Sequence, residues 1–400
     1  MNYQPHHNDG SEMFNRNTRI LVAPNSYKEC ASSTVASELI AQKLVQIGYL
    51  DVTKFPLSDG GDGFLEVCRR NFHFHLQFIE NRKCYNNSRT KVCVGYDAVS
   101  KTAYVEVADF IGLKKIPKAK RKPTLLNSRN LGEFILHLQE RNPEIKKIII
   151  GIGGTGINDL GLGLCDVFGL QLFDKNGKSL DAIPLNYFCA AKIVLPRKIG
   201  IAVEVVLDVE IPLYGDTGTS KIFAAQKGAD YNDITMLEVG VINILSILER
   251  DHGFEFKMKL IGAGGGVSLG LSLISDVRIT RSQQFLMDTL KLGKLLDDCD
   301  VVITGEGKFD EQSFMNKATG IVIKEAQARN KKIIMLVGSS EIQFPVCDNN
   351  VPKVFEFIPL FKSSAEAMEN FEKGISLGIE QCFGTADLQA NRISKSMLLM

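Results

Sequence analysis

The stretch from Asp300 to Gln312 constrains the fold of this chain more than any other segment. Its residues Val301 to Ile303 form a short apolar run, which is typical of a parallel-sheet strand buried on both faces. Gly305 and Gly307 follow at once, and glycine permits positive φ or the close approach of a ligand. This pattern predicts a ligand site at the carboxyl end of a strand. A tight strand-to-helix turn with solvated acids is the alternative, since short glycine turns are common.

Both ends of the chain alternate strands with helices, whereas the middle begins with hairpin-like strands. We expect strands at 19–24, 52–57, 300–303, 332–337 and 354–358, and helices at 33–45, 64–70 and 312–329. In the middle we expect strands at 90–96, 102–107 and 145–150 and helices at 131–140 and 160–168.

These elements predict an α/β protein with two domains. A Rossmann/flavodoxin-like parallel-sheet domain is expected to comprise residues 19–75 and 285–400, with a second α/β domain, residues 76–284, inserted into it. The polar residues 1–18 are expected to be a disordered N-terminal extension. We expect the active site in the cleft between the two domains.

Charge and cysteine content exclude several classes of function. The 47 Lys and Arg balance 46 Asp and Glu to a net charge of +1, so no global field attracts nucleic acid or an anionic membrane. The nine cysteines are scattered without CxxC pairs, which favours reduced thiols in a cytoplasmic protein over a disulfide framework or a zinc site. The N-terminus lacks the apolar segment of a signal peptide.

Three more glycine-rich loops carry candidate chemistry. Asp59-Gly-Gly-Asp-Gly precedes a helix, so amides and a helix N-terminus could meet a phosphate while an acid holds Mg2+. The loop 151–159 repeats this plan, and the loop 260–270 could form an anion nest. The third loop matches neither GxGxxG nor a Walker A loop, and a dinucleotide oxidoreductase is a weak alternative. Each loop taken alone could be a structural turn.

Six ordered motifs between residues 19 and 385 resemble those of the type I glycerate kinases. The chain has Ala23-Pro-Asn-Ser-Tyr-Lys, Asp59-Gly-Gly-Asp-Gly, Gly151-Ile-Gly-Gly-Thr-Gly-Ile-Asn-Asp, Gln226-Lys-Gly-Ala, Gly262-Ala-Gly-Gly-Gly and Ile303-Thr-Gly-Glu-Gly-Lys-Phe-Asp-Glu-Gln. The resemblance implies ATP-dependent phosphorylation of D-glycerate with Mg2+, giving 2-phosphoglycerate in the bacterial members. Such a transfer needs mainly positioning and charge neutralisation.

Residue by residue, the resemblance implies catalytic roles for Asp59, Asp62, Lys28 and Asp208. Asp59 and Asp62 are candidates either for metal binding or for orienting the attacking hydroxyl, and Glu306 is a second candidate metal ligand. Substrate or phosphate contacts are expected from Ser26, Gly60, Gly61, Gly153, Gly154, Thr155, Asn158, Asp159, Gln226, Lys227, Gly264, Gly265, Gly266, Thr304, Gly305, Glu306, Asp310 and Gln312. For each of these residues, a helix cap or a loop brace is the structural alternative.

The chain also departs from the family pattern. Asn25 stands for the family's Asp, and Glu29-Cys30 stands for Gly-Ser. Ile157, Glu210-Ile211 and the segment 125–131 also differ. These changes keep open a kinase for a related hydroxy acid, or a non-catalytic member that binds an organic acid or nucleotide as a regulator. D-glycerate and ATP are the expected partners, without nucleic acid or membrane, and a homodimer is left open.

Overall fold

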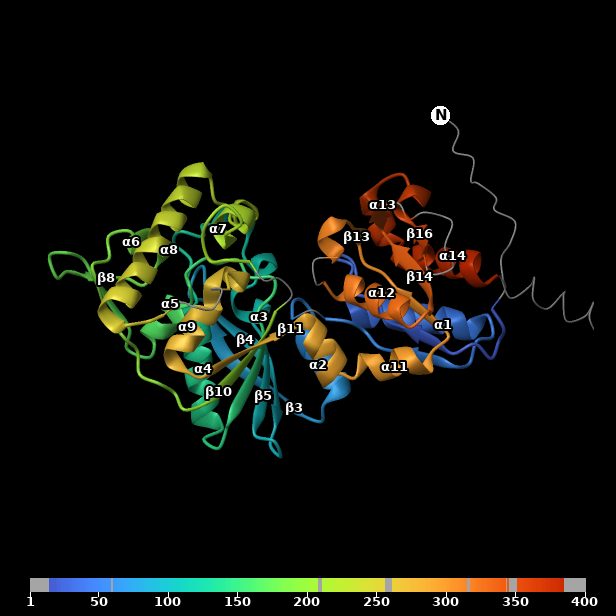
Figure 1. The fold of residues 1–400 in the computed structure, drawn as a ribbon, viewed down its shortest axis with the longest axis horizontal. Helices are drawn as coiled ribbons and strands as arrows, with labels where there is room; N and C mark the ends of the chain where they lie inside the picture. The colour runs from blue at the N-terminus through green and yellow to red at the C-terminus, as the bar shows by residue number, and fades with distance from the viewer. Residues whose placement is uncertain are drawn as a thin grey trace, which may run out of the picture. The chain divides into compact units, whose positions relative to one another are not determined.

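The structure, a computed structural model, describes residues 14–58, 60–207, 211–255, 261–314, 317–342, 344 and 351–384. The chain divides into two compact units (Figure 1). Met1–Ser58 and Leu286–Met400 together form the first unit, and Asp59–Phe285 form the second. Because the first unit is assembled from both ends of the chain, the second interrupts it in sequence.

A five-stranded parallel sheet lies at the centre of the first unit, in the order β16-β14-β12-β1-β2. Its strands are β1 (Ile20–Val22), β2 (Val52–Lys54), β12 (Val301–Thr304), β14 (Lys332–Val337) and β16 (Lys353–Glu356). Numbered within the unit, this is the 2-1-3-4-5 order of flavodoxin-like sheets. The predicted Rossmann/flavodoxin-like parallel sheet is therefore confirmed.

Helices cover both faces of this sheet. On one face α1 (Ser33–Gln46) and α14 (Phe371–Phe383) pack on each other and share a core with inward residues of β1, β12 and β14. On the other side α12 (Ala318–Ala328) packs on β12 and β14 and is joined by α11 (Leu292–Asp298). The unit also contains α13 (Ser364–Glu369) and the short parallel pair β13 (Lys308–Phe309) and β15 (Ser339–Ser340).

Two boundaries differ from the expectation. The helix expected at 312–329 begins as an α-helix only at Ala318, because Ser313 closes a separate local turn on Asp310. Residues 14–18, expected to be part of a disordered extension, lie against the first unit: the Phe14 ring is 4.9 Å from that of Phe383, and its carbonyl accepts a hydrogen bond from Tyr49 at 2.8 Å. The rest of that extension lies outside the described residues.

The second unit is built on a six-stranded mixed sheet in the order β11-β10-β6-β5-β4-β3. The first four of these strands run parallel. β4 pairs antiparallel with β5 on one side and with β3 on the other, so β3 and β4 form a hairpin. The strands are β3 (His75–Arg82), β4 (Arg89–Asp97), β5 (Thr102–Glu106), β6 (Lys147–Gly151), β10 (Ala202–Leu207) and β11 (Val277–Arg281). A smaller sheet holds β7 (Gln171–Phe173), β8 (Ser179–Leu180) and β9 (Lys192–Val194).

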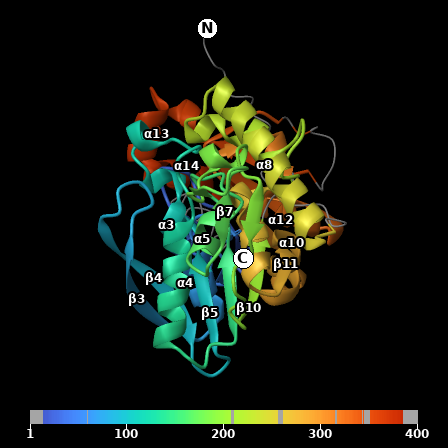
Figure 2. The same ribbon diagram turned by 90° about the vertical axis from the view of Figure 1, so that its left-hand side faces the viewer.

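One face of the large sheet carries a layer of helices, α4 (Arg129–Arg141), α5 (Leu162–Asp166) and α9 (Val267–Ile274), as Figure 2 shows for α4 and α5. The short α2 (Phe64–Asn71) packs on β5 and β4. The remaining helices are α3 (Ala108–Ile111), α6 (Pro184–Tyr187), α7 (Thr219–Phe223), α8 (Tyr231–His252) and α10 (Ser282–Gln284).

Residues 59–75 group with the second unit, whereas the sequence assigned them to the first. The reason lies in their contacts, because α2 packs on β5 and β3 pairs with β4 over eight residues. A site between the domains stays a prediction.

Among the described residues, only α8 is long and apolar enough by length and composition to cross a bilayer. It begins with a capping box, in which Asp230 and Asp233 exchange side-chain hydrogen bonds with each other's backbone N–H, and it ends at Gly253 in the left-handed conformation. One face of the helix, including Val241, Ile244 and Leu248, is buried in the core of the second unit, whereas Val239 and Ile242 on the other face are exposed. These are the features of an ordinary core helix.

Candidate functional site

In the first unit, the loops that follow β1 and β12 are held together at the carboxyl ends of these neighbouring strands. The backbone N of Asn25 donates to the carbonyl of Gly305 at 2.8 Å, and Oγ1 of Thr304 donates to the carbonyl of Ala23 at 2.7 Å. In a 2-1-3-4-5 sheet this is the point where the strand order reverses and where ligands bind. The predicted site segments of the first unit therefore share the expected edge of the sheet.

Gly305 is required here by packing. A Cβ at this position would lie 1.7 Å from the carbonyl oxygen of Leu336, which no side chain can accommodate. The next residue, Glu306, is 8% exposed, and Tyr27 is buried and donates to the same Leu336 carbonyl at 2.6 Å. Burial, and then the charge of Glu306, raises the pKa of the Tyr27 hydroxyl, so Tyr27 acts as a neutral hydrogen-bond donor.

Lys28 lies on a tight turn that presents it to solvent. Tyr27 and Ala31 form the bridge that closes the turn, and Glu29 adopts a left-handed conformation with φ of 63°. A glycine at this position would carry less strain, because a left-handed conformation costs other residues about 1 kcal/mol. Both Lys28 and Glu29 are exposed, so the lysine and a carboxylate stand together at the predicted anion site.

At the end of the predicted site segment 300–312, Asp310 makes contacts that hold the local turn. The backbone N of Asp310 donates to Oγ of Ser313 at 3.2 Å, and its carboxylate lies 3.8 Å from Nζ of Lys308. Lys308 is closer to Glu341, at 2.7 Å. The side chain of Gln312 lies outside the described residues.

In the second unit, three glycine loops from distant parts of the sequence pack backbone to backbone. The N of Gly153 donates to the carbonyl of Gly60 at 2.9 Å, and a Cβ on Gly153 would lie 2.5 Å from Cα of Gly61. The N of Leu160 donates to the carbonyl of Gly265 at 3.0 Å. The three loops thus form one cluster, which we call the glycine cluster and which comprises residues 60–63, 151–159 and 262–266.

The third loop owes its shape to three successive glycines. Gly264, Gly265 and Gly266 have φ values of 64°, 72° and 80°, a run of left-handed residues that only glycine adopts without strain. A Cβ on Gly265 would lie 2.1 Å from the carbonyl oxygen of Ile157, so the second and third loops touch directly. At this contact the two backbones approach too closely for a side chain to fit between them.

Asp62 is the acid that the structure places at the glycine cluster. Its carboxylate forms an ion pair with Lys114, and its Oδ1 would be 3.2 Å from a Cβ on Gly154. The side chain is 34% exposed, so it reaches solvent beside the exposed Gly154. A carboxylate, a lysine and a glycine turn therefore meet at the carboxyl end of β6, an arrangement that suits a phosphate with a bound cation.

Glu106, at the end of β5, holds the Asp62 turn and was missed by the sequence reasoning. Its two carboxylate oxygens accept hydrogen bonds from the backbone N of Gly63 at 3.1 Å and of Leu65 at 3.2 Å, so it caps α2 from another element. Burial, followed by the charge of Asp109, raises the pKa of Glu106 to about 7. The signal that marked Asp208, an acid at the end of an apolar strand, also marks Glu106.

Three predicted ligand residues are buried behind the glycine cluster. The carboxylate of Asp159 is fully buried and accepts from Ser128, Gly161 and Gly163. Nζ of Lys227 donates to the carbonyl of Ile157 at 2.8 Å and to Oδ1 of Asn158 at 2.7 Å, and burial lowers the pKa of Lys227 to about 7. In this structure these side chains brace the second glycine loop.

The other predicted residues are scattered or undescribed. Thr155 is buried and forms a bridge with Gly112, and Gln226 is exposed. Asp59 and Asp208 lie outside the described residues.

Within the described ranges, the His, Cys, Asp and Glu side chains form no group of three or more that could hold a metal ion. Mg2+ usually keeps several waters and is bound by one or two carboxylates together with substrate phosphates. Asp62, partly exposed beside main-chain groups of the glycine cluster, provides a donor of that type in the second unit. Glu306 provides one in the first, so the donor chemistry fits Mg2+.

The sequence and the fold of this chain are similar to those of known proteins. The model of the Glycerate kinase family matches residues 20–386. The Glycerate kinase of Neisseria meningitidis serogroup B is 30% identical over 90% of this chain and 96% of its own length. The Glycerate 2-kinase of Escherichia coli K12 is 31% identical over 80% and 85%. Among solved structures, a crystal structure of a protein described as glycerate kinase 2 from Salmonella typhimurium LT2 superposes with a TM-score of 0.72, at 27% identity, covering 94% of this chain and 99% of that one.

Proposed function

The chain belongs to the glycerate kinase family, and on this premise we propose that it transfers the γ-phosphoryl group of ATP to the 2-hydroxyl of D-glycerate in the cytoplasm. A bond forms between the hydroxyl oxygen and the γ-phosphorus, and the bond from that phosphorus to ADP breaks. The hydroxyl proton passes to a base, and the products are 2-phosphoglycerate and ADP. One observation carries the proposal: three glycine loops converge in the second unit beside the paired Asp62 and Lys114.

The chemistry of phosphoryl transfer explains why such a cluster is useful. Charge on the transferred group is spread over its oxygens, so catalysis depends on positioning and on preorganised charge rather than on covalent chemistry. Main-chain groups of the tightly packed loops are fixed in place, because Gly60 and Gly153 leave no space for a Cβ. We infer that these loops bind phosphate oxygens and that Lys114 offsets their charge.

The acids have distinct proposed roles. Asp62 would hold Mg2+ or orient the attacking hydroxyl, and Glu106 keeps the Asp62 turn in place by capping α2. In the first unit, Lys28 would bind the anion and Glu306 would serve as a metal ligand. When bound, Mg2+ would neutralise negative charge on the phosphates. Asp59 and Asp208 are proposed as further acids from their positions in the family motifs.

A coupled assay tests the proposal. The protein is incubated with ATP, Mg2+ and D-glycerate, and the product is coupled to enolase and pyruvate kinase without phosphoglycerate mutase. A signal identifies 2-phosphoglycerate as the product. A signal that needs added mutase identifies the 3-isomer instead, and no signal in either format contradicts the proposal.

A kinase for a related hydroxy acid is the second candidate. It is favoured by the segment 125–131, where the chain departs from the family pattern and where Arg129 forms ion pairs with Glu133 and Asp166. Turnover of another small hydroxy acid in the same assay, without turnover of D-glycerate, would support this candidate. Binding of an acid or nucleotide without turnover of any acid would favour a regulatory member.

A further inference from the structure

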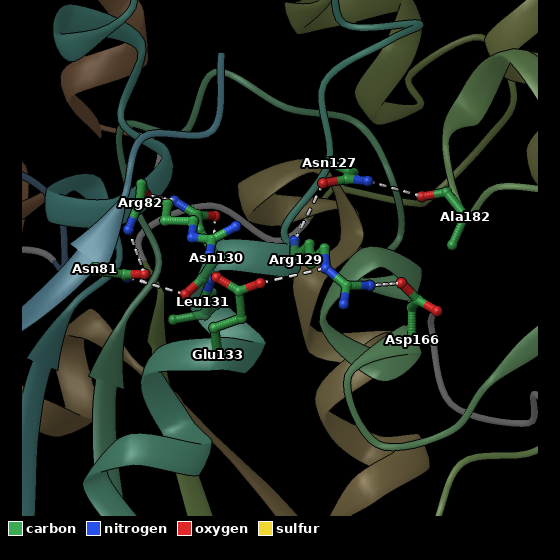
Figure 3. Close-up of polar contacts among 9 residues, drawn as sticks. All are labelled: Asn81, Arg82, Asn127, Arg129, Asn130, Leu131, Glu133, Asp166 and Ala182. Atoms are coloured by element: carbon green, nitrogen blue, oxygen red, sulfur yellow. Dashed lines mark hydrogen bonds and ion pairs between the residues drawn. The ribbon is translucent and has the colours of Figure 1, made fainter. Parts of the chain in front are cut away.

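A polar pocket of about 220 Å³ lies in the second unit between the end of β3 and the beginning of α4, and Figure 3 draws polar contacts among residues around it. Its lining residues are Arg82, Cys84, Asn87, Leu125, Asn127, Arg129, Asn130 and Glu133. The volume is far larger than one water needs and smaller than the pockets that hold drug-sized ligands. The pocket is therefore of a size that suits a small molecule. It is separate from the glycine cluster, because none of its lining residues belongs to that cluster.

Hydrogen bonds fix the walls of this pocket. Nδ2 of Asn130 donates to the carbonyl of Phe110 at 2.7 Å and to that of Arg82 at 3.2 Å. Nδ2 of Asn81 donates to the carbonyl of Asn130 at 2.9 Å. Both asparagines are 5% exposed, so these bonds are shielded from water (Figure 3). They tie the end of β3 to the first turn of α4, and the pocket is built before any ligand arrives.

The two arginines of the pocket differ in their surroundings. Nε of Arg129 lies 3.3 Å from Glu133, and its other end forms an ion pair with Asp166 (Figure 3), so its charge is balanced by two carboxylates. In the part of the chain that the structure describes, the guanidinium of Arg82 makes no hydrogen bond or ion pair, although its backbone does both accept and donate. Arg82 therefore supplies uncompensated positive charge.

We propose that this pocket binds a small hydroxylated oxyanion through Arg82. The planar guanidinium of arginine donates two parallel hydrogen bonds to a carboxylate or phosphate group. Glu133, held in place by Arg129, accepts a hydrogen bond from a hydroxyl of the same ligand. A hydroxy acid and a phosphate ester of a polyol share this chemistry, because each carries an oxyanion and a hydroxyl within a few bonds.

The pocket is linked to the glycine cluster through one residue. Ser128, between Asn127 and Arg129 of the pocket, donates twice to Asp159 of the second glycine loop, at 2.7 Å each. The inference rests on the proposed function only in the choice of D-glycerate as the first ligand to test.

Binding is measured by isothermal titration calorimetry on the full chain without nucleotide. D-glycerate is titrated in one arm and inorganic phosphate in the other, which separates a carboxylate ligand from a phosphate ligand. We expect at least one of them to bind, and Arg82→Gln to weaken that binding at least about tenfold. Arg82→Lys keeps the charge but not the planar donor pair, so an intermediate affinity is expected.

Arg89→Gln is the matched control. Arg89 pairs with Arg82 across the β3–β4 hairpin, is 86% exposed at its side chain and does not line the pocket. Arg89→Gln removes one positive charge from the same hairpin as Arg82→Gln does, but outside the pocket. Its binding affinity is therefore expected to match that of the wild type. Equal losses in the two variants would show a general charge effect and would overturn the inference.

Other results decide between the inference and the proposed function. Failure of both ligands to bind the wild type, or equal binding to wild type and Arg82→Gln, overturns the inference even if the kinase assay succeeds. Arg82-dependent binding in a protein that turns over no D-glycerate upholds the inference while the proposed function fails. A thermal unfolding midpoint equal to that of the wild type shows that a variant is folded. This result is expected for both substitutions, because Arg82 and Arg89 are exposed.

Discussion

Oδ2 of Asp159 accepts two hydrogen bonds from Ser128, one from its backbone N and one from its Oγ, both at 2.7 Å. The same carboxylate accepts from the backbone N of Gly161 and of Gly163, each at 3.1 Å. One buried side chain therefore fixes the second glycine loop, the beginning of α5 and the beginning of α4. Burial raises the pKa of Asp159 in spite of these donors.

Asp159→Ala is expected to lower the free energy of unfolding by at least about 3 kcal/mol, because buried donors lose their acceptor. Chemical denaturation measures the loss. Asp166→Ala, at the end of the adjacent helix α5, removes an ion pair whose carboxylate is 37% exposed, and it is expected to cost less than about 1 kcal/mol. Similar losses in the two variants would contradict a bracing role for Asp159.

Gly265→Ala tests the close approach of the second and third glycine loops. The added Cβ would lie 2.1 Å from the carbonyl of Ile157, and the φ of 72° adds left-handed strain. Gly253→Ala is the control, since Gly253 has a φ of 67° with nothing within 4 Å of the added Cβ. We expect about 1 kcal/mol of destabilisation at Gly253 from strain alone. At Gly265 we expect a loss at least about 2 kcal/mol greater, measured by denaturant unfolding.

Equal losses at Gly253 and Gly265 would mean that the loops separate at little cost, and that the glycine cluster is not preorganised. A folded Gly265→Ala protein with unchanged turnover would also remove the third loop from the proposed phosphate site.

The parallel sheet of the first unit could be predicted because its signals are local. A buried run such as Val301 to Ile303, followed at once by glycine, reports both the burial of a strand and the point where it ends. The glycine loops could be found for the same reason, because close backbone contact demands glycine in the sequence. What could not be predicted is which loops touch, since that depends on strand order.

The roles of the polar residues were harder to predict. Asp159 and Lys227 have the residue types of a phosphate site, yet packing buries both, and burial is a property of the fold rather than of the motif. Glu106 acts on the backbone of Gly63, 43 residues earlier, so no motif joins them. The pocket at Arg82 likewise depends on a contact with Asn130, 48 residues later, and became visible only with β3 and α4 in place.

Glu106 predicts a specific pH dependence of stability. Its pKa rises from 4.5 to about 7 on folding, so the folded state favours the protonated acid. The resulting stabilisation is fully present below pH 4.5 and is lost as the pH rises through 7. Glu106→Gln removes this titration, so the variant is expected to gain up to about 3 kcal/mol relative to the wild type between pH 4.5 and 8.

Denaturant unfolding at several pH values, plotted as the difference between variant and wild type, isolates this contribution of Glu106. Glu80→Gln is the control, because Glu80 is an exposed glutamate on β3 of the same unit. Its difference curve is expected to be flat. A flat curve for Glu106→Gln as well would show that the carboxylate is not held in the protonated form by burial.

Asp62→Asn tests the acid that the structure places at the glycine cluster. The substitution keeps the shape of the side chain but removes the charge that pairs with Lys114. We expect turnover of D-glycerate to fall at least about tenfold, which corresponds to about 1.4 kcal/mol of transition-state stabilisation. The same fall is expected for Asp59→Asn, from its place in the same motif. Steady-state kinetics with the coupled assay measures both.

Asp97→Asn is the control for these kinetic variants. Asp97 lies at the end of β4 and accepts hydrogen bonds from Val99 and Ser100 on an exposed turn, so its charge has no part in the proposed reaction. Its turnover is expected to stay within about twofold of the wild type. If folded Asp62→Asn protein also stays within that range, Asp62 neither holds the metal nor orients the hydroxyl, and Asp59 becomes the acid of this motif that the transfer requires.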